Sequence, residues 1–346
     1  MYCHFYASPN LDGCAFIENS PDGLYAHATS SPQLEDCSFS GHTSRGLACD
    51  GGSPTIEGCR FFENGGIGLR LRESSATITG CSFWNNYASD GGALYLDWDY
   101  SGTVMDCLFY NNTAAGSGGA VWCGTGAPTF INCTMAYNDA GSGAGGIACG
   151  SATVTIENTI IAFSTTGEAV AGSATLSCCD LYGNAGGDWV GDIAGQFGID
   201  GNISEDPLFC NPPAGDFTLP EDSPCAPFSP PNPECGLIGS EPVVCDPSGL
   251  GVQEWPRGPL SLLALPNPAA FGTTLHLNQP LHSGARVEVL DASGRLVWRH
   301  SVSEGAQTPL RWSARDLDGS PVPAGVYHIR AIDAARQVSG RVVIIR

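Results

Sequence analysis

Side chains suited to binding sugars occur in the first half of the sequence. Tryptophan and tyrosine rings can stack on sugar rings, and aspartate and arginine can hydrogen-bond to sugar hydroxyl groups. The residues of these types that a repeat brings onto neighbouring strands are Asp50, Arg70, Arg72, Tyr95, Asp97, Trp98 and Trp122. Whether they can form one site depends on the elements that carry them.

The repeat is centred on a cysteine-rich segment that recurs eight times, with anchors 20 to 26 residues apart. Its anchor positions are Cys14, Cys37, Cys59, Cys81, Cys107, Cys133, Thr159 and Cys179. Apolar residues lie three positions before and two positions after each anchor, which breaks the two-residue alternation of a single strand. The residue directly before the anchor is usually Gly, Asp or Asn, the types that tolerate positive φ. A bend is therefore predicted there, and asparagine five positions after most anchors predicts a ladder of side-chain amides.

A second apolar segment precedes six anchors by about ten residues, as in GLRLR and ALYLD. A unit with two or three short strands and sharp turns predicts one coil of a parallel β-solenoid. The motifs F-x-x-N, at Phe16–Asn19 and Phe61–Asn64, and G-G-A, at Gly91–Ala93, resemble the repeats of polymorphic outer-membrane proteins. They also resemble the broad group of right-handed β-helices that includes pectate-lyase-like folds. The resemblance implies a right-handed parallel β-helix of about eight coils over residues 1–205.

Three interpretations of the sugar-binding residues follow from this fold. Arg70, Tyr95 and Trp122 are expected to point outward on successive coils, beside Asp50, Arg72 and Asp97. One interpretation is a glycan-binding face without catalysis, and it is favoured because no paired-carboxylate or nucleophile motif is present. A second, suggested by the resemblance to pectate lyases, is a polysaccharide lyase or glycoside hydrolase acting on an acidic polysaccharide, with an arginine base beside Ca²⁺. The third is an ordinary surface on which Asp50, Arg72 and Asp97 form an ion ladder of small energetic value.

The cysteines are expected to have two different roles. Anchor cysteines on adjacent coils lie about 4.8 Å apart and bridge poorly, so buried thiols are expected. Cys210, Cys225, Cys235 and Cys245 instead lie in a proline-rich segment, residues 206–245, which is interpreted as a stapled cap on the open end of the β-helix. Of the three possible connectivities, the pairing of Cys210 with Cys225 and of Cys235 with Cys245 is favoured.

A different pattern begins after a linker at residues 246–260. Residues 261–346 contain seven short alternating segments separated by turn signals such as DASGR and DLDGS, which predicts a β-sandwich. The motifs PNP, VEVLDASGRLV and the terminal VVIIR resemble the flagellar-hook-cap-type Ig-like domain and the sorting domains of type IX secretion. That resemblance implies export and contact with secretion or anchoring machinery; the alternative is a plain accessory domain.

Charge and composition limit the function further. Residues 1–245 contain 27 acidic residues and four arginines, and the whole chain contains no lysine. This balance disfavours nucleic acid as a partner, and no segment is long and apolar enough for a transmembrane helix. No metal or cofactor motif is recognised, although acids such as Asp188, Asp192 and Asp200 could attract Ca²⁺. The expected protein is an extracellular or outer-membrane-surface scaffold that binds polysaccharide or cell-surface glycan. Because Cys3 falls in a mid-coil position, further coils and a signal peptide are expected upstream.

Overall fold

The computed structural model describes residues 1–3, 7–27, 29–245, 262–265, 273–277, 285–301, 310–333 and 336–344 of the 346-residue chain. Two compact units cover residues 1–251 and 252–346. The predicted linker at 246–260 lies outside the described residues. Within those that are described, no helix has both the length and the apolar character needed to cross a membrane.

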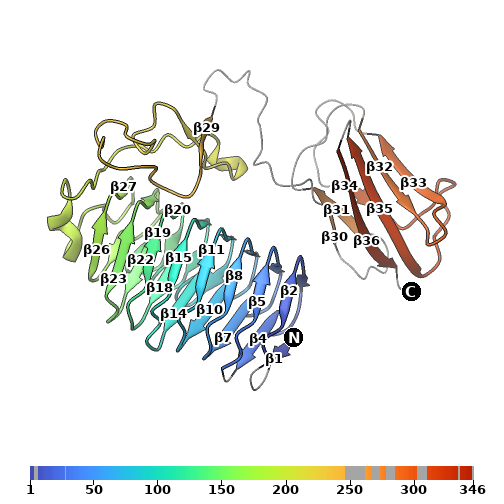
Figure 1. Cartoon of the computed structure of the whole chain (residues 1–346), viewed down its shortest axis with the longest axis horizontal. Helices are drawn as coiled ribbons and strands as arrows, with labels where there is room; N and C mark the ends of the chain where they lie inside the picture. The colour runs from blue at the N-terminus through green and yellow to red at the C-terminus, as the bar shows by residue number, and fades with distance from the viewer. Residues whose placement is uncertain are drawn as a thin grey trace. The chain divides into compact units, whose positions relative to one another are not determined.

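The first unit is a parallel β-helix built from three eight-stranded sheets (Figure 1). Sheet 1 consists of β1 (Tyr2–Cys3), β4 (Leu24–His27), β7 (Leu47–Asp50), β10 (Leu69–Arg72), β14 (Leu94–Asp97), β18 (Val121–Cys123), β22 (Ala144–Cys149) and β25 (Glu168–Ala171). Sheet 2 consists of β2 (Asn10–Asp12), β5 (Gln33–Glu35), β8 (Thr55–Glu57), β11 (Thr77–Thr79), β15 (Thr103–Met105), β19 (Thr129–Ile131), β23 (Val154–Glu157) and β26 (Ala174–Ser177). Sheet 3 consists of β3 (Ala15–Ile17), β6 (Ser38–Ser40), β9 (Arg60–Phe62), β12 (Ser82–Trp84), β16 (Leu108–Tyr110), β20 (Thr134–Ala136), β24 (Ile160–Ala162) and β27 (Asp180–Tyr182).

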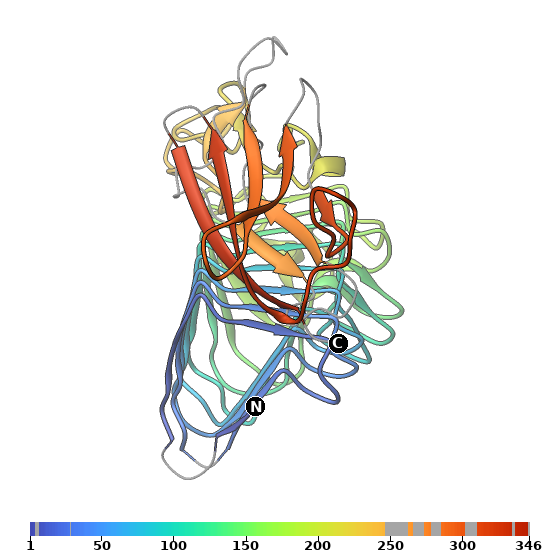
Figure 2. The same cartoon turned by 90° about the vertical axis from the view of Figure 1, so that its right-hand side faces the viewer.

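Each coil contributes one strand to every sheet, and the successive coils lie one behind another (Figure 2). A short fourth sheet joins β13 (Tyr87–Ala88), β17 (Thr113–Ala114) and β21 (Asp139–Ala140) in the three coils that are 26 residues long. The predicted all-β fold with a parallel β-helix is therefore confirmed, and each of its three main sheets has eight strands.

The bend between sheets 2 and 3 lies where the sequence places it. The residue before each anchor has positive φ, between 47° at Asn158 and 61° at Gly80. The bend turns the next strand so that the phenylalanine two residues after the anchor points into the core. Rings of Phe39, Phe61 and Phe83 stack with centroids 5.0 and 4.8 Å apart, close to the spacing of neighbouring strands.

The predicted amide ladder is also present, and its members Asn64, Asn86, Asn112 and Asn138 are buried. Asn64 Nδ2 donates to Asn86 Oδ1 at 2.8 Å, and Asn86 Nδ2 donates to Asn112 Oδ1 at 2.9 Å. Each amide also donates to a backbone carbonyl of the preceding coil, as Asn86 Nδ2 does to Phe61 O at 2.9 Å. The ladder satisfies polar backbone groups at a turn that would otherwise be buried without partners.

The anchor cysteines are free thiols, as predicted. Those after Cys14 are buried, and their sulfurs lie near backbone carbonyls, such as Cys107 Sγ at 3.1 Å from Met105 O. Burial raises the pKa of the Cys133 thiol to about 12, so the thiol stays protonated. These cysteines act as small core residues.

The open C-terminal end of the β-helix is covered by residues 184–203, here called the end cap. It includes the 3₁₀ helix η1 (Gly191–Gln196), whose Ile193 is part of the main core. The side-chain amide of Gln196 makes the hydrogen bonds that another strand would make at the edge of β26. Its Oε1 accepts from Leu176 N and its Nε2 donates to Ala174 O, both at 2.8 Å. The end cap thus protects an edge that would otherwise invite pairing with another chain.

The predicted cap segment, residues 206–245, lies elsewhere and is here called the side flap. It contains η2 (Pro212–Ala214), β28 (Leu219–Pro220) and β29 (Val243–Cys245). Apolar flap residues such as Leu219 and Ile238 pack on Ile160 and Ala162 at the outer face of sheet 3. The proline-rich side flap has little hydrophobic core of its own, and it is therefore stabilised by packing against the β-helix.

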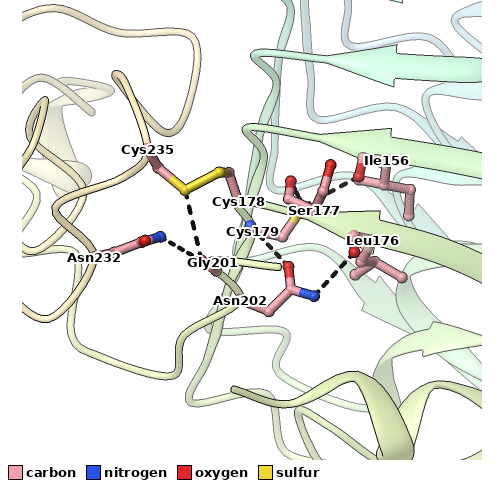
Figure 3. The surroundings of a disulfide bond; sticks show 9 residues. All are labelled: Ile156, Leu176, Ser177, Cys178, Cys179, Gly201, Asn202, Asn232 and Cys235. Atoms are coloured by element: carbon pink, nitrogen blue, oxygen red, sulfur yellow. Dashed lines mark hydrogen bonds between the residues drawn. A yellow bond between two sulfur atoms is a disulfide. The ribbon is translucent and has the colours of Figure 1, made fainter. Parts of the chain in front are cut away.

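The favoured disulfide pairing was wrong. The bonds join Cys210 to Cys245 and Cys178 to Cys235, each with Cα atoms 5.7 Å apart, while Cys225 is a buried free thiol. Cys178 occupies the bend position before the anchor Cys179, and its side chain points outward to the side flap (Figure 3). The sequence reasoning assumed that the four flap cysteines pair among themselves, and so it overlooked Cys178.

The second unit has two antiparallel sheets. One consists of β30 (Leu262–Leu265), β31 (Thr273–Leu277) and β34 (Leu310–Trp312), and the other of β33 (Leu296–Ser301), β32 (Arg286–Leu290), β35 (Gly325–Asp333) and β36 (Arg336–Ile344). Leu275 and Trp312 of the first sheet share a hydrophobic core with Val287, Ile329 and Val342 of the second. Seven strands around one core fit the predicted sandwich; its Ig-like character and sorting role stay predictions.

Candidate functional site

The predicted sugar-binding residues lie on the outer face of sheet 1, from β7 to β18. The parallel register places Arg70 between Ala48 and Tyr95, and Tyr95 beside Trp122. It also places Arg72 between Asp50 and Asp97. The neighbour relations predicted from the repeat are therefore confirmed, and Trp98 follows β14 in the adjoining turn.

Asp50 is paired with Arg70. Arg70 Nη2 lies 2.8 and 2.6 Å from the two carboxylate oxygens of Asp50, and both side chains are largely buried. The hydroxyl of Tyr25 donates a third hydrogen bond, 2.7 Å long, to Asp50. Ala48, which lies between Tyr25 and Arg70, is completely covered. In this part of the face the Asp50 carboxylate is therefore held by Arg70 and Tyr25.

A second ion pair continues the network toward the N-terminus. Arg45 Nε and Nη2 donate to the two oxygens of Asp22 at 2.9 and 2.7 Å, and the Arg45 guanidinium also lies 5.8 Å from the Tyr25 ring centroid. Burial by itself raises the pKa of Asp22, but Arg45 lowers it below its usual value. Asp22, Tyr25 and Arg45 were not predicted as site residues, although Tyr25 and Asp50 lie on neighbouring strands of the repeat.

Arg72 is placed differently from Arg70. Its guanidinium lies 4.6 Å from the Trp98 ring centroid and 5.6 Å from that of Tyr95, within cation–π range. In the part of the chain that the structure describes, it has no ion pair, and its Nε is covered without a hydrogen-bond partner. The ion ladder expected from Asp50 through Arg72 to Asp97 does not form.

Asp97 faces away from Arg72, toward the next coil. Its Oδ2 accepts from the Tyr95 hydroxyl at 3.2 Å, and its Oδ1 accepts from the backbone N–H of Trp98 at 2.8 Å. A β-carbon at Gly124 would come within 2.1 Å of Asp97 Oδ1, so only glycine leaves room for this carboxylate. Burial and the Asp97 charge raise the pKa of Tyr95, which keeps its hydroxyl protonated and able to donate.

Trp98 is the most accessible of the three aromatic residues predicted for the site. It is 51% exposed, and its backbone, like that of Asp99, has positive φ. The backbone N–H of Asp99 donates to Thr125 Oγ1 at 2.9 Å, which ties the turn to the following coil. Trp122 is half-buried on β18. The Trp98 and Tyr95 rings thus lie near the Arg72 guanidinium, and Trp122 lies beside Tyr95 on the next strand.

Sheet 3 carries another group of outward aromatic residues that the sequence reasoning did not single out. The rings of Phe62 and Trp84 are parallel at 4.5 Å, Trp84 stacks on Tyr110 at 5.9 Å, and Tyr110 meets Phe217 of the side flap at 5.1 Å. Because these rings cover one another's faces, they leave mainly edges for a ligand. They are better explained as packing than as a sugar-binding platform.

The acidic residues that were considered as Ca²⁺ ligands, such as Asp188, do not cluster around one point in the described residues. Asp188 accepts hydrogen bonds from the backbone N–H groups of Gly183 and Asn184 and from the Asn184 amide. Within the described residues, no group of three or more histidine, cysteine or acidic side chains is arranged to hold a metal ion.

Comparison with known proteins supports the fold of the first unit. A family model described as "Right handed beta helix region" matches residues 3–135. Among solved structures, the chain is similar to PorZ, described as an essential bacterial surface component of the type-IX secretion system of Porphyromonas gingivalis. That likeness has 28% identity and a TM-score of 0.21, and it covers 25% of this chain but only 11% of PorZ. A search of curated proteins finds no match.

Proposed function

We propose that the protein is an exported scaffold that binds glycans on the outer face of sheet 1, at the surface formed by Arg72, Tyr95, Trp98 and Trp122. One observation carries the proposal: Trp98 is half exposed, and the guanidinium of Arg72 lies 4.6 Å from its ring centroid. A tryptophan side chain has only two side-chain torsions, so it gives contact area at a small entropic cost. Sugar rings have apolar faces that stack on such a surface, and their hydroxyl groups find Tyr95 and Asp97 beside it.

The proposal is of binding without catalysis. Glycoside hydrolases use two carboxyl groups that flank the scissile bond, one of them free to give up or take a proton. On this face Asp50 already accepts three hydrogen bonds from Tyr25 and Arg70, and Asp97 is bonded to Tyr95 and Trp98. Both carboxylates therefore serve to position neighbouring side chains.

Export is proposed on two grounds. Disulfides persist mainly outside the cytosol, and the first unit contains two. The motifs of residues 261–346 resemble sorting domains, and we propose that this unit contacts secretion or anchoring machinery. Deleting residues 261–346 tests this in the native host: loss of the protein from the medium and cell surface is expected, whereas unchanged export would make the unit a plain accessory domain.

A glycan array probed with the full chain tests the binding function. The wild type is expected to bind a defined set of glycans, and Trp98→Ala is expected to lose that binding. Tyr87→Ala is the matched control, because Tyr87 is similarly exposed, at 56%, but lies on β13 outside sheet 1. An array without signal, or binding that survives Trp98→Ala, contradicts the proposal. Cleavage of a bound polysaccharide that Arg72→Ala abolishes would favour a lyase instead.

A further inference from the structure

The few cationic side chains of the β-helix are concentrated on one face. Residues 1–245 contain 27 acidic residues but only four arginines. Arg45, Arg70 and Arg72 belong to sheet 1 or to the turn that leads into it, whereas Arg60 is exposed on sheet 3. Such a concentration is unexpected for arginines that only offset the general acidity of the surface.

Within the described residues, two of these three arginines form an ion pair and the third does not. Arg45 is paired with Asp22 and Arg70 with Asp50. Arg72 has neighbours that stabilise a cation without neutralising it, namely the rings of Tyr95 and Trp98. Its Nε, like that of Arg70, is covered and has no hydrogen-bond partner in the described residues, so an external group could reach only the rest of the guanidinium. The charge of this guanidinium is therefore available to an external anion.

The neighbouring acid, Asp97, makes no ion pair with Arg72 in the described residues. Asp97 is held toward Gly124 on the next coil by its hydrogen bonds to Tyr95 and the Trp98 backbone. The Tyr95 hydroxyl already donates its one proton to Asp97, so Arg72 itself has to supply the hydrogen bonds to an anion bound here. The exposed Trp98 ring adjoins the same guanidinium.

We infer that Arg72 binds the carboxylate of an acidic sugar whose ring stacks on Trp98. The inference rests on the proposed glycan-binding function and specifies its ligand. Arginine suits a carboxylate because its planar group can donate two parallel hydrogen bonds. The charge of the surrounding protein limits the class of ligand further. A unit with 27 acidic residues repels a polyanion at long range. The expected ligand is a largely neutral glycan with one uronic-acid residue, in preference to a polyuronate.

Calorimetric titration of the full chain with two matched trisaccharides tests the inference. One carries a terminal hexuronic acid, and the other is its carboxyl-reduced, neutral counterpart. The acidic trisaccharide is expected to bind roughly ten- to a hundredfold more tightly, the range of a charge-assisted hydrogen bond. Arg72→Gln should remove this preference, Arg72→Lys should keep part of it, and the control Arg60→Gln should leave it unchanged.

The outcomes separate the inference from the function on which it rests. Equal binding of both trisaccharides, lost in Trp98→Ala but kept in Arg72→Gln, overturns the inference and leaves glycan binding intact. Tighter binding of a polyuronate than of the single-acid trisaccharide overturns it as well. Absence of binding to either trisaccharide overturns the inference, and a blank glycan array would also overturn the function. The wild-type comparison of the two sugars decides the question even if Arg72→Gln fails to fold.

Discussion

Cys178 and Cys235 form a disulfide across 57 residues of sequence and join the last coil of the β-helix to the side flap. The neighbouring Gly201 lies against both sulfurs, and its carbonyl accepts a hydrogen bond from the Asn232 amide (Figure 3). The disulfide therefore attaches the side flap to the β-helix in the segment between β28 and β29, which contains no helix or strand.

Cys178→Ser is expected to loosen the side flap and to leave the coils intact. Closing a loop of this length by a disulfide is worth about 4 kcal/mol in the chain-entropy model. Limited proteolysis should cut the variant within residues 206–245 while the β-helix resists. Cys225→Ser is the matched control, because Cys225 is a buried free thiol of the same flap. Non-reducing peptide mapping that pairs Cys225 with any partner would contradict the structure.

Asn86→Ala should destabilise the β-helix strongly. The Asn86 amide donates to Phe61 O and Asn112 Oδ1, and its oxygen accepts from the Asn64 amide. Truncation leaves these groups buried without partners, and a cost of roughly 3 to 5 kcal/mol is expected. Denaturant unfolding measures it, with the exposed Thr77→Ala on β11 as the control. Equal midpoints for the two variants would show that the ladder adds no net stability.

The sequence predicted those features that repeat. Anchor, bend and asparagine positions recur in register, so their stacking follows once parallel coils are inferred. The Cys178–Cys235 bond was missed because it depends on the path of a flap that has no periodicity. On sheet 1 the register was predicted, but not the side-chain partners: Arg70 reaches diagonally to Asp50, whereas Arg72 turns to Trp98. Long side chains reach diagonal neighbours, and spacing alone does not choose among them.

His42 should make the fold sensitive to acid. It takes an asparagine position in the ladder, and its Nδ1 accepts from Asn19 N at 3.0 Å. Burial lowers the pKa of His42, so the unfolded chain takes up this proton first as the pH falls. The contribution of neutral His42 to the free energy of unfolding is fully present above the pKa of the unfolded chain, about 6.5. It is lost as the pH falls through the lower pKa of the folded chain.

His42→Asn should restore the amide pattern and reduce this acid sensitivity. The difference in unfolding free energy between variant and wild type is expected to grow in favour of the variant from pH 7 to pH 5. Urea titrations at several pH values measure it. A constant difference across that range would mean that His42 does not titrate with unfolding.

Asp180 should act in the opposite direction. It is fully buried beneath the side flap, where it accepts hydrogen bonds from Glu205 N at 3.0 Å and from the Cys225 thiol at 3.1 Å. Burial raises the pKa of Asp180 to about 7, with the charges of Glu205 and Asp188 adding to the shift. The folded chain therefore binds this proton more tightly than the unfolded chain, whose carboxyl titrates near pH 3.9.

The sign of the effect follows from that difference. Stability from protonated Asp180 is fully present below about pH 4 and is lost as the pH rises through 7, by an amount on the order of a few kcal/mol. Asp180→Asn keeps an acceptor for Glu205 N and carries no charge. The variant should therefore gain stability relative to wild type between pH 5 and pH 8, and at pH 8 its flap should resist proteolysis longer. Burial also raises the pKa of Glu241 in the same flap, so the difference between the two chains is the quantity to measure. If that difference stays flat from pH 5 to pH 8, Asp180 is ionised in the folded protein and the flap holds a buried carboxylate.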